Sequence, residues 1–169
     1  GQPLKMVRAR GMALILPVMH PFKGIAMMQL GDMAGGEKCI LDGVEESRSM
    51  KAIGSIATSD LVLGEIYTRM ALGINTPPLA QIMRNLPYVL KTLPFAAAKA
   101  QKHLDAALVY FRKVDAPSYV AWALYDQALL DQKKKRQEAA TSKFNEAREL
   151  AQSVALDPLV EMINEAAGN

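Results

Sequence analysis

The stretch KRQEAATSKFNEARELAQ, residues 135–152, places Ala140, Phe144, Ala147 and Ala151 at successive steps of four, three and four residues. Side chains at these steps lie on one face of an α-helix. A helix on the surface of a globular protein usually carries larger apolar residues along that face. Because alanine side chains are short, this face predicts a close approach between helix backbones, with the phenylalanine filling the space between the alanines.

The order of small, large and small residues recurs along the chain. The segment AKAQKHLDAALVYF, residues 98–111, repeats it forty residues earlier, and GEKCILDGVEE, residues 36–46, carries a weaker copy. A constant offset between helical segments indicates a repeat array, in which each helix pair leaves an apolar face that its neighbour covers. The residues concerned are Ala100, Leu104 and Ala107 in one copy and Gly36, Ile40 and Gly43 in the other.

Helix-forming residues dominate the chain, and runs of alternating β-branched residues, which would indicate strands, do not occur. The fold class is therefore predicted to be all-α. Pro87 should kink or split the segment that contains it, because proline cannot donate the backbone hydrogen bond that a helix interior needs. The expected helices cover residues 18–30, 34–48, 53–72, 79–93, 95–114, 117–132, 136–154 and 158–167, with a further helix over 3–16 that Gly11 interrupts.

In its middle section the chain resembles the tetratricopeptide repeat family. The segment LGEIY supplies the leucine–glycine doublet and the tyrosine of that family's first helix, at Leu63, Gly64 and Tyr67. The resemblance implies a right-handed superhelix of antiparallel helix pairs, within a single domain over residues 1–169. The implied units cover residues 18–48, 53–114 including an inserted helix at 79–93, and 117–154, followed by a C-terminal cap at 158–167.

The inserted helix and the segment that follows it, residues 100–139, are together similar to the C-terminal helical region of large bacterial-type class III adenylate/guanylate cyclases. In those proteins a cyclase domain and an ATPase domain precede the repeats. The resemblance implies that this chain is a regulatory part of a larger protein and is not itself an enzyme. The chain begins with Gly1 and not with methionine, which also favours an excised piece of a longer protein.

Composition and charge exclude several classes of function. The chain has 20 basic and 17 acidic residues, and this net charge of +3 is too small to indicate a nucleic-acid partner. The apolar run at residues 12–19 is too short to span a bilayer, so no membrane span is expected. The single cysteine, Cys39, forms no internal disulfide and fits a reducing, cytoplasmic setting.

Two motifs come close to known sites without matching them. GDMAGGEKC, residues 31–39, has the glycine spacing of a phosphate loop, but Glu37 stands where that loop needs its lysine. The only histidines, His20 and His103, show no metal-ligand spacing with Cys39, and no cysteine–histidine pair is placed by the sequence. We therefore expect no catalytic residues, no metal and no cofactor in this chain.

Four consecutive basic residues, KKKR at 133–136, fall at an expected turn between helices. The simplest interpretation is a solvated turn. The alternative is contact with an acidic partner, because clustered positive charge attracts one.

The first helices of stacked pairs line the concave side of a repeat array, where polar and aromatic groups can hold a peptide. We therefore expect a non-catalytic module that binds a protein or peptide partner. The alternative is a small-ligand-binding or enzymatic helical domain with a pocket beside helix 79–93. The candidate partner-binding residues are Thr58, Glu65, Arg69, Tyr119, Trp122 and Asp126.

The two ends of the array differ in character. Residues 158–167 can cap the last pair with apolar side chains on one face and polar ones on the other. Residues 12–19 are continuously apolar, and an exposed patch of that kind marks an interface. A homodimer through this N-terminal segment is the simplest expectation.

Overall fold

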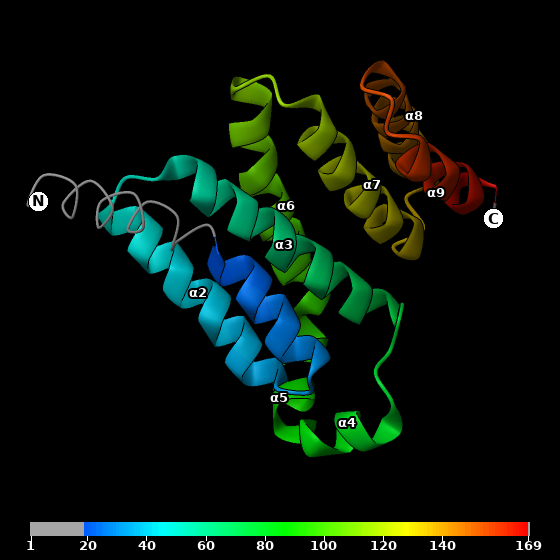
Figure 1. Ribbon diagram of the computed structural model, residues 1–169. Coiled ribbons are helices and arrows are strands. Elements are labelled where there is room, and N and C mark those ends of the chain that lie inside the picture. Colours follow the sequence, from blue (N-terminus) through cyan, green and yellow to red (C-terminus); the bar gives the residue numbers. More distant parts are fainter. Residues whose placement is uncertain (1–18, 169) are drawn as a thin grey trace, which may run out of the picture. The chain divides into compact units, whose positions relative to one another are not determined.

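Residues 19–168 are described by a computed structural model of the chain (Figure 1). Every regular element in this range is helical, which confirms the all-α prediction. From α2 onward and outside the 79–93 segment, each bound lies within one residue of the predicted one. After a helical stretch over residues 19–29, the elements are α2 (Met33–Ser49), α3 (Ile53–Leu72), α4 (Leu79–Arg84), α5 (Leu86–Thr92), the 3-10 helix η1 (Leu93–Phe95), α6 (Ala96–Lys113), α7 (Pro117–Lys133), α8 (Gln137–Ser153) and α9 (Asp157–Ala167).

The helix expected over residues 79–93 is divided. α4 ends at Arg84, and Asn85 separates it from α5. Pro87 then lies in the first turn of α5, where its missing N–H leaves no helical hydrogen bond unmade. The predicted effect of Pro87 is therefore confirmed.

Six helix ends share one turn geometry, in which a residue with positive φ follows the helix and two backbone hydrogen bonds close its last turn. After α7, the Arg136 N–H donates to the Asp131 carbonyl and the Lys135 N–H to the Gln132 carbonyl, both at 2.9 Å. Four of the six residues are not glycine, although this backbone conformation costs them roughly 1 kcal/mol each. The six residues are Gly31, Lys51, Gly73, Asp115, Lys135 and Ala155.

The described chain forms two compact units. The first contains residues 19–59 and 78–89, and the second contains residues 60–77 and 90–168. The boundary between the units passes through α3. The single domain with repeat units over residues 18–48, 53–114 and 117–154 stays a prediction.

In the first unit, glycines hold α2 close to the helical residues 19–29. A Cβ on Gly36 would lie 2.5 Å from the Gly24 carbonyl oxygen, and a Cβ on Gly24 would lie 2.4 Å from a side-chain carbon of Ile40. The turn between these two helices is fastened by Asn85, whose amide donates to the Gly31 carbonyl at 2.8 Å and accepts from the Met33 N–H at 3.3 Å. The small–large–small pattern of this segment thus lies where two helix backbones touch.

In the second unit, α6, α7, α8 and α9 pack in sequence order, each on the next (Figure 1, yellow-green to red). Ala140 and Ala147 are completely buried and Phe144 is 2% exposed, which confirms the predicted contact face of α8. The equivalent residues of α6, Ala100, Leu104 and Ala107, are also completely buried. Burying one side chain of the size of leucine or phenylalanine contributes about 2 kcal/mol, so the repeated pattern marks the core of this unit.

The remaining fold predictions concern the two ends of the chain. Leu159 and Ile163 of α9, where we predicted a C-terminal cap, are completely buried, and α9 packs beside α8. The helix predicted over residues 3–16 lies outside the described residues, as does the apolar segment 12–19 apart from Met19, and with it the predicted homodimer contact. No helix within residues 19–168 has an apolar stretch long enough to cross a membrane.

Candidate functional site

Three predicted partner-binding residues come together where α3 faces α7 in the second unit. Glu65 and Arg69, one turn apart on α3, form an ion pair. Both act electrostatically on Asp126 of α7, Glu65 as a like charge and Arg69 as an opposite one. The sequence placed each of these residues on its own helix but did not show that they lie near one another, which the structure does.

Asp126 is an unusual member of this group because it is a carboxyl group without a close partner among the described residues. It is only 5% exposed, and it accepts no hydrogen bond from any residue within 19–168. Burial, and secondarily the nearby negative charge of Glu65, raises the pKa of Asp126 to about 8, while Arg69 partly offsets the rise. At neutral pH this side chain is therefore mostly a neutral carboxylic acid held at the edge of the core.

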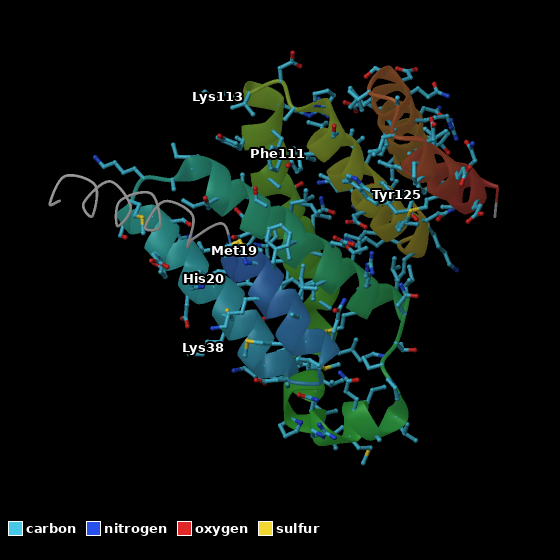
Figure 2. The ribbon with its side chains drawn as sticks, viewed as in Figure 1. Met19, His20, Lys38, Phe111, Lys113 and Tyr125 are labelled. Carbon is cyan, nitrogen blue, oxygen red and sulfur yellow. The ribbon has the colours of Figure 1, made fainter. Side chains whose placement is uncertain are left out.

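Aromatic side chains of α7 continue the same face. Trp122, the only tryptophan, packs edge-on against Tyr125, with ring centroids 6.2 Å apart. Tyr125, which is labelled in Figure 2, has its ring centroid 6.2 Å from that of the buried Phe144. Burial and the neighbouring Asp126 raise the pKa of the Tyr125 hydroxyl. Trp122 remains partly exposed, so its ring is accessible from solvent.

The other two predicted residues do not join this group in the same way. Tyr119 is 46% exposed and stacks on Phe111 of α6, with ring centroids 4.5 Å apart. Thr58 belongs to the first unit, where its hydroxyl donates to the Gly54 carbonyl at 3.0 Å. That bond is local to α3, and serine and threonine commonly form it inside helices.

Tyr125 was missed by the sequence analysis. The signal was present, because Tyr125 follows Trp122 by three residues and therefore shares its side of the helix. We define the acidic aromatic face as Glu65, Arg69, Trp122, Tyr125 and Asp126.

A second polar cluster joins α3 to α6. His103 pairs with Asp60, Nδ1 to Oδ1 at 2.8 Å, and both side chains are less than a fifth exposed. The imidazole stacks on the buried ring of Tyr67, with centroids 5.7 Å apart. Beside them a Cβ on Gly64 would lie 2.6 Å from Leu104, so the LGEIY segment forms a close helix contact. His103 thus joins α6 to α3 through its contacts with Asp60 and Tyr67.

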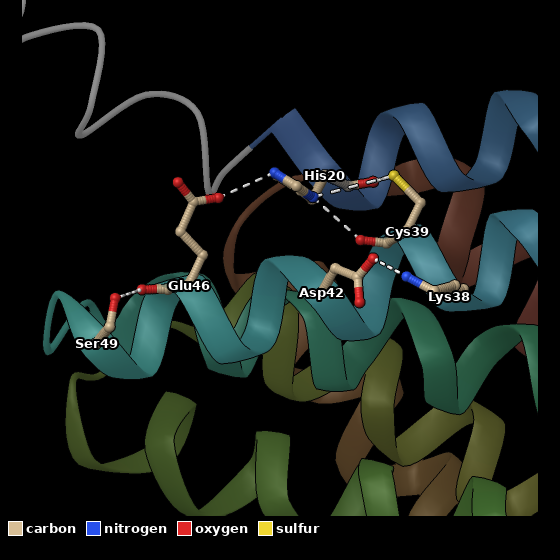
Figure 3. Close-up of polar contacts among 6 residues, drawn as sticks. All are labelled: His20, Lys38, Cys39, Asp42, Glu46 and Ser49. Carbon is tan, nitrogen blue, oxygen red and sulfur yellow. Dashed lines mark hydrogen bonds and ion pairs between the residues drawn. The ribbon is translucent and has the colours of Figure 1, made fainter.

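His20, Cys39 and Glu46 meet in the first unit (Figure 3), a combination that the sequence did not place. His20 Nε2 lies 3.1 Å from Glu46 Oε2, and His20 Nδ1 lies 3.1 Å from the Cys39 carbonyl oxygen and 4.0 Å from its Sγ. The Cys39 thiol donates to the His20 carbonyl at 3.8 Å.

This group does not have the geometry of a cysteine–histidine nucleophile. The base of such a pair must take the thiol proton, whereas here Nδ1 faces a carbonyl oxygen to which it can only donate, and the thiol hydrogen points to another carbonyl. The thiol is also buried, at 8% exposure. These contacts fasten the helical residues 19–29 to α2.

Metal-binding side chains do not cluster within residues 19–168, where no three histidine, cysteine, aspartate or glutamate residues could hold one ion together. His20 illustrates the reason, because its ring lies between Cys39 and Glu46 and turns a different nitrogen to each.

Compared with known proteins, the chain matches no protein-family model, no curated protein and no solved structure.

Proposed function

We propose that the chain is a non-catalytic interaction module, whose acidic aromatic face binds a segment of another protein that carries a basic side chain next to an apolar one. Asp126 carries the proposal: a buried carboxyl group that no described residue hydrogen-bonds is ready to accept a donor from outside. A lysine or arginine of the partner would supply the positively charged donor that no described residue gives to this carboxyl group.

The charges around the face favour a basic partner over an acidic one. Arg69 is already paired with Glu65, so the group of this face that remains for a partner is the carboxyl of Asp126, which a nearby positive charge would ionise. Glu165 of α9 adds a further negative charge near Tyr125. An acidic segment would meet like charges, whereas a basic one would lower the pKa of Asp126 toward its ordinary value.

The exposed part of Trp122 gives such a segment an apolar surface. Tryptophan is among the side chains that contribute most to binding when a partner covers them. A basic residue contacting Asp126, followed by an apolar residue against Trp122, matches the chemistry of the two adjacent groups. In this proposal the helix pairs form a tetratricopeptide-like array, and the parent protein is a nucleotide cyclase in which this chain regulates and does not synthesise.

The experiment is selection of peptides from a displayed random library on the immobilised chain. We expect recovered peptides that share a lysine or arginine beside an apolar residue, and that change the fluorescence of Trp122 when they bind. Asp126→Asn and Trp122→Ala should weaken their binding at least tenfold, because each removes one of the two contacts. Glu149→Gln, which removes an exposed carboxylate of α8, serves as the matched control and should leave binding unchanged.

Two results would overturn the proposal. The first is recovery of peptides without a shared basic residue. The second is equal binding of the recovered peptides to the Asp126→Asn, Trp122→Ala and Glu149→Gln variants. Because the contact ionises Asp126, binding should also release protons near pH 7, which calorimetry in buffers of different ionisation enthalpy measures directly.

A further inference from the structure

Four cationic side chains surround an open hollow of about 670 Å³ in the second unit, away from the residues of the acidic aromatic face. They come from three places: Lys102 from α6, Lys134 and Arg136 from the turn after α7, and Lys143 from α8. Lys134 and Arg136 belong to the basic run at 133–136. The structure thus brings part of that run together with Lys102 of α6 and Lys143 of α8. Two carboxylates, Asp105 and Asp131, also line the hollow, which leaves an excess of positive charge.

The two carboxylates are already occupied by partners. Asp131 is 2% exposed and binds Lys143, Nζ to Oδ2 at 2.6 Å, with Arg136 at 3.7 Å from its other oxygen. Asp105 accepts hydrogen bonds from the amides of Gln127 and Gln101, at 2.6 and 2.9 Å. Asp131 thus holds two of the cationic groups in place at the hollow.

The other two cationic groups have no such partner in the part of the chain that the structure describes. Neither Lys102 nor Lys134 pairs with a carboxylate within residues 19–168, and both are exposed. Their charges therefore remain available to a ligand. The hollow also includes Ala139 in the first turn of α8. The N–H groups of this turn donate no hydrogen bond to the side chain of the capping residue, and such a turn favours an anion.

We propose that this hollow binds a compact anion that carries two or more adjacent phosphate groups. Three lysines supply compact charges and one arginine supplies a planar fork of N–H donors, and both suit phosphate oxygens approached from several directions. Among the described residues that line the hollow none is aromatic, so they offer no surface on which a nucleobase could stack. The volume lies within the range of small-molecule sites, which fits a ligand of a few phosphate groups with a small carrier.

Soluble phosphates and the phosphorylated headgroup of a lipid share this chemistry. The test therefore has two parts. The first is calorimetric titration of the full chain with inorganic triphosphate in about 150 mM salt, where weak contacts between exposed charges are screened. The second is co-sedimentation with phosphatidylcholine vesicles that do or do not contain a bisphosphorylated phosphoinositide.

The double variant Lys102→Ala/Lys134→Ala removes the two unpaired charges from exposed positions, so it should fold as the unsubstituted chain does. The matched control is Lys135→Asn, which removes one charge from the same basic run at a residue that does not line the hollow. Asparagine is chosen because Lys135 has a φ of 59°, which asparagine tolerates.

We expect one triphosphate to bind per chain, roughly tenfold more weakly in the double variant for each lysine lost and with little change in Lys135→Asn. Binding to triphosphate alone identifies a soluble ligand, and additional binding to the phosphoinositide vesicles that the double variant loses identifies a lipid headgroup. The proposal is overturned if triphosphate shows no saturable binding, or if the double variant and Lys135→Asn weaken it equally. It is also overturned if a hexaglutamate peptide binds as tightly as triphosphate, because the hollow would then select for charge and not for phosphate.

Discussion

Replacing Asp126 by asparagine should make the protein more stable, and by an amount that grows with pH. The folded chain raises the pKa of Asp126 from its ordinary value of 3.8 to about 8. Between these two values the folded state binds the proton more tightly than the unfolded state does. The contribution of protonated Asp126 to the free energy of unfolding is therefore fully present below about pH 4. It is lost as pH rises toward about 8, and above that pH it stays constant.

The size of the effect follows from the same shift. Each pH unit inside the window costs up to about 1.4 kcal/mol, so the unsubstituted chain should lose about 4 kcal/mol of unfolding free energy from this group between pH 5 and pH 8. Asparagine has nearly the same shape and no titrating proton, so the variant avoids this loss. The difference between the two proteins isolates Asp126, because every other titrating group is common to both.

Urea unfolding at pH 5, 6, 7 and 8, followed by helical circular dichroism, measures the difference. Asp131→Asn is the matched control on the same helix. Asp131 is also buried but binds Lys143 and Arg136, so its loss should destabilise the protein by about 1–3 kcal/mol. A stability difference between the unsubstituted chain and Asp126→Asn that stays constant from pH 5 to pH 8 would refute the reasoning, and so would an asparagine variant that is the less stable protein at pH 8.

Three further predictions concern packing and turns, and thermal or urea unfolding tests each of them. Ala147→Leu should cost about 1–3 kcal/mol, because the completely buried site has no space for three more carbon atoms; an unchanged midpoint would mean that α8 does not pack through this face. Gly36→Ala should also destabilise by roughly 1–3 kcal/mol, although alanine favours helices, since its Cβ would lie 2.5 Å from the Gly24 carbonyl oxygen; a stabilised variant would contradict that close contact. Ala155→Gly should stabilise by about 0.5–1 kcal/mol, because a φ of 53° is strained for alanine and not for glycine; a loss of stability would show that the turn tolerates alanine without strain.

The helices themselves could be read from the sequence because their signals are local. Helical spacing of apolar residues, together with proline and glycine at the boundaries, placed α2, α3 and α6–α9 within one residue. The small–large–small pattern also identified Ala140, Phe144 and Ala147 as core, since tight helix contacts require short side chains. The break near Pro87 followed from the covalent structure of proline alone.

The sites were harder to predict because they depend on which helices become neighbours. Glu65 and Asp126 are separated by 61 positions, and no periodicity along one helix shows that α3 faces α7. The basic hollow has the same origin, because Lys102 meets the turn after α7 only through packing of α6 on α7. The boundary between the two compact units has no signal in the sequence either, since it falls inside α3, where the sequence has no break.

The helix-ending turns carry a consequence for how such a chain can change in length. Positive φ values occur at residues 31 and 51 and again at residues 115, 135 and 155, which are steps of twenty residues. Each step contains one helix and one turn of nearly constant size. A duplication of forty residues would therefore add a complete antiparallel helix pair, and a deletion of forty residues would remove one. In both cases the chain that follows would keep its original direction. A change of twenty residues would reverse that direction and expose the wrong face of every later helix. Length variation among descendants of this sequence should therefore favour multiples of forty.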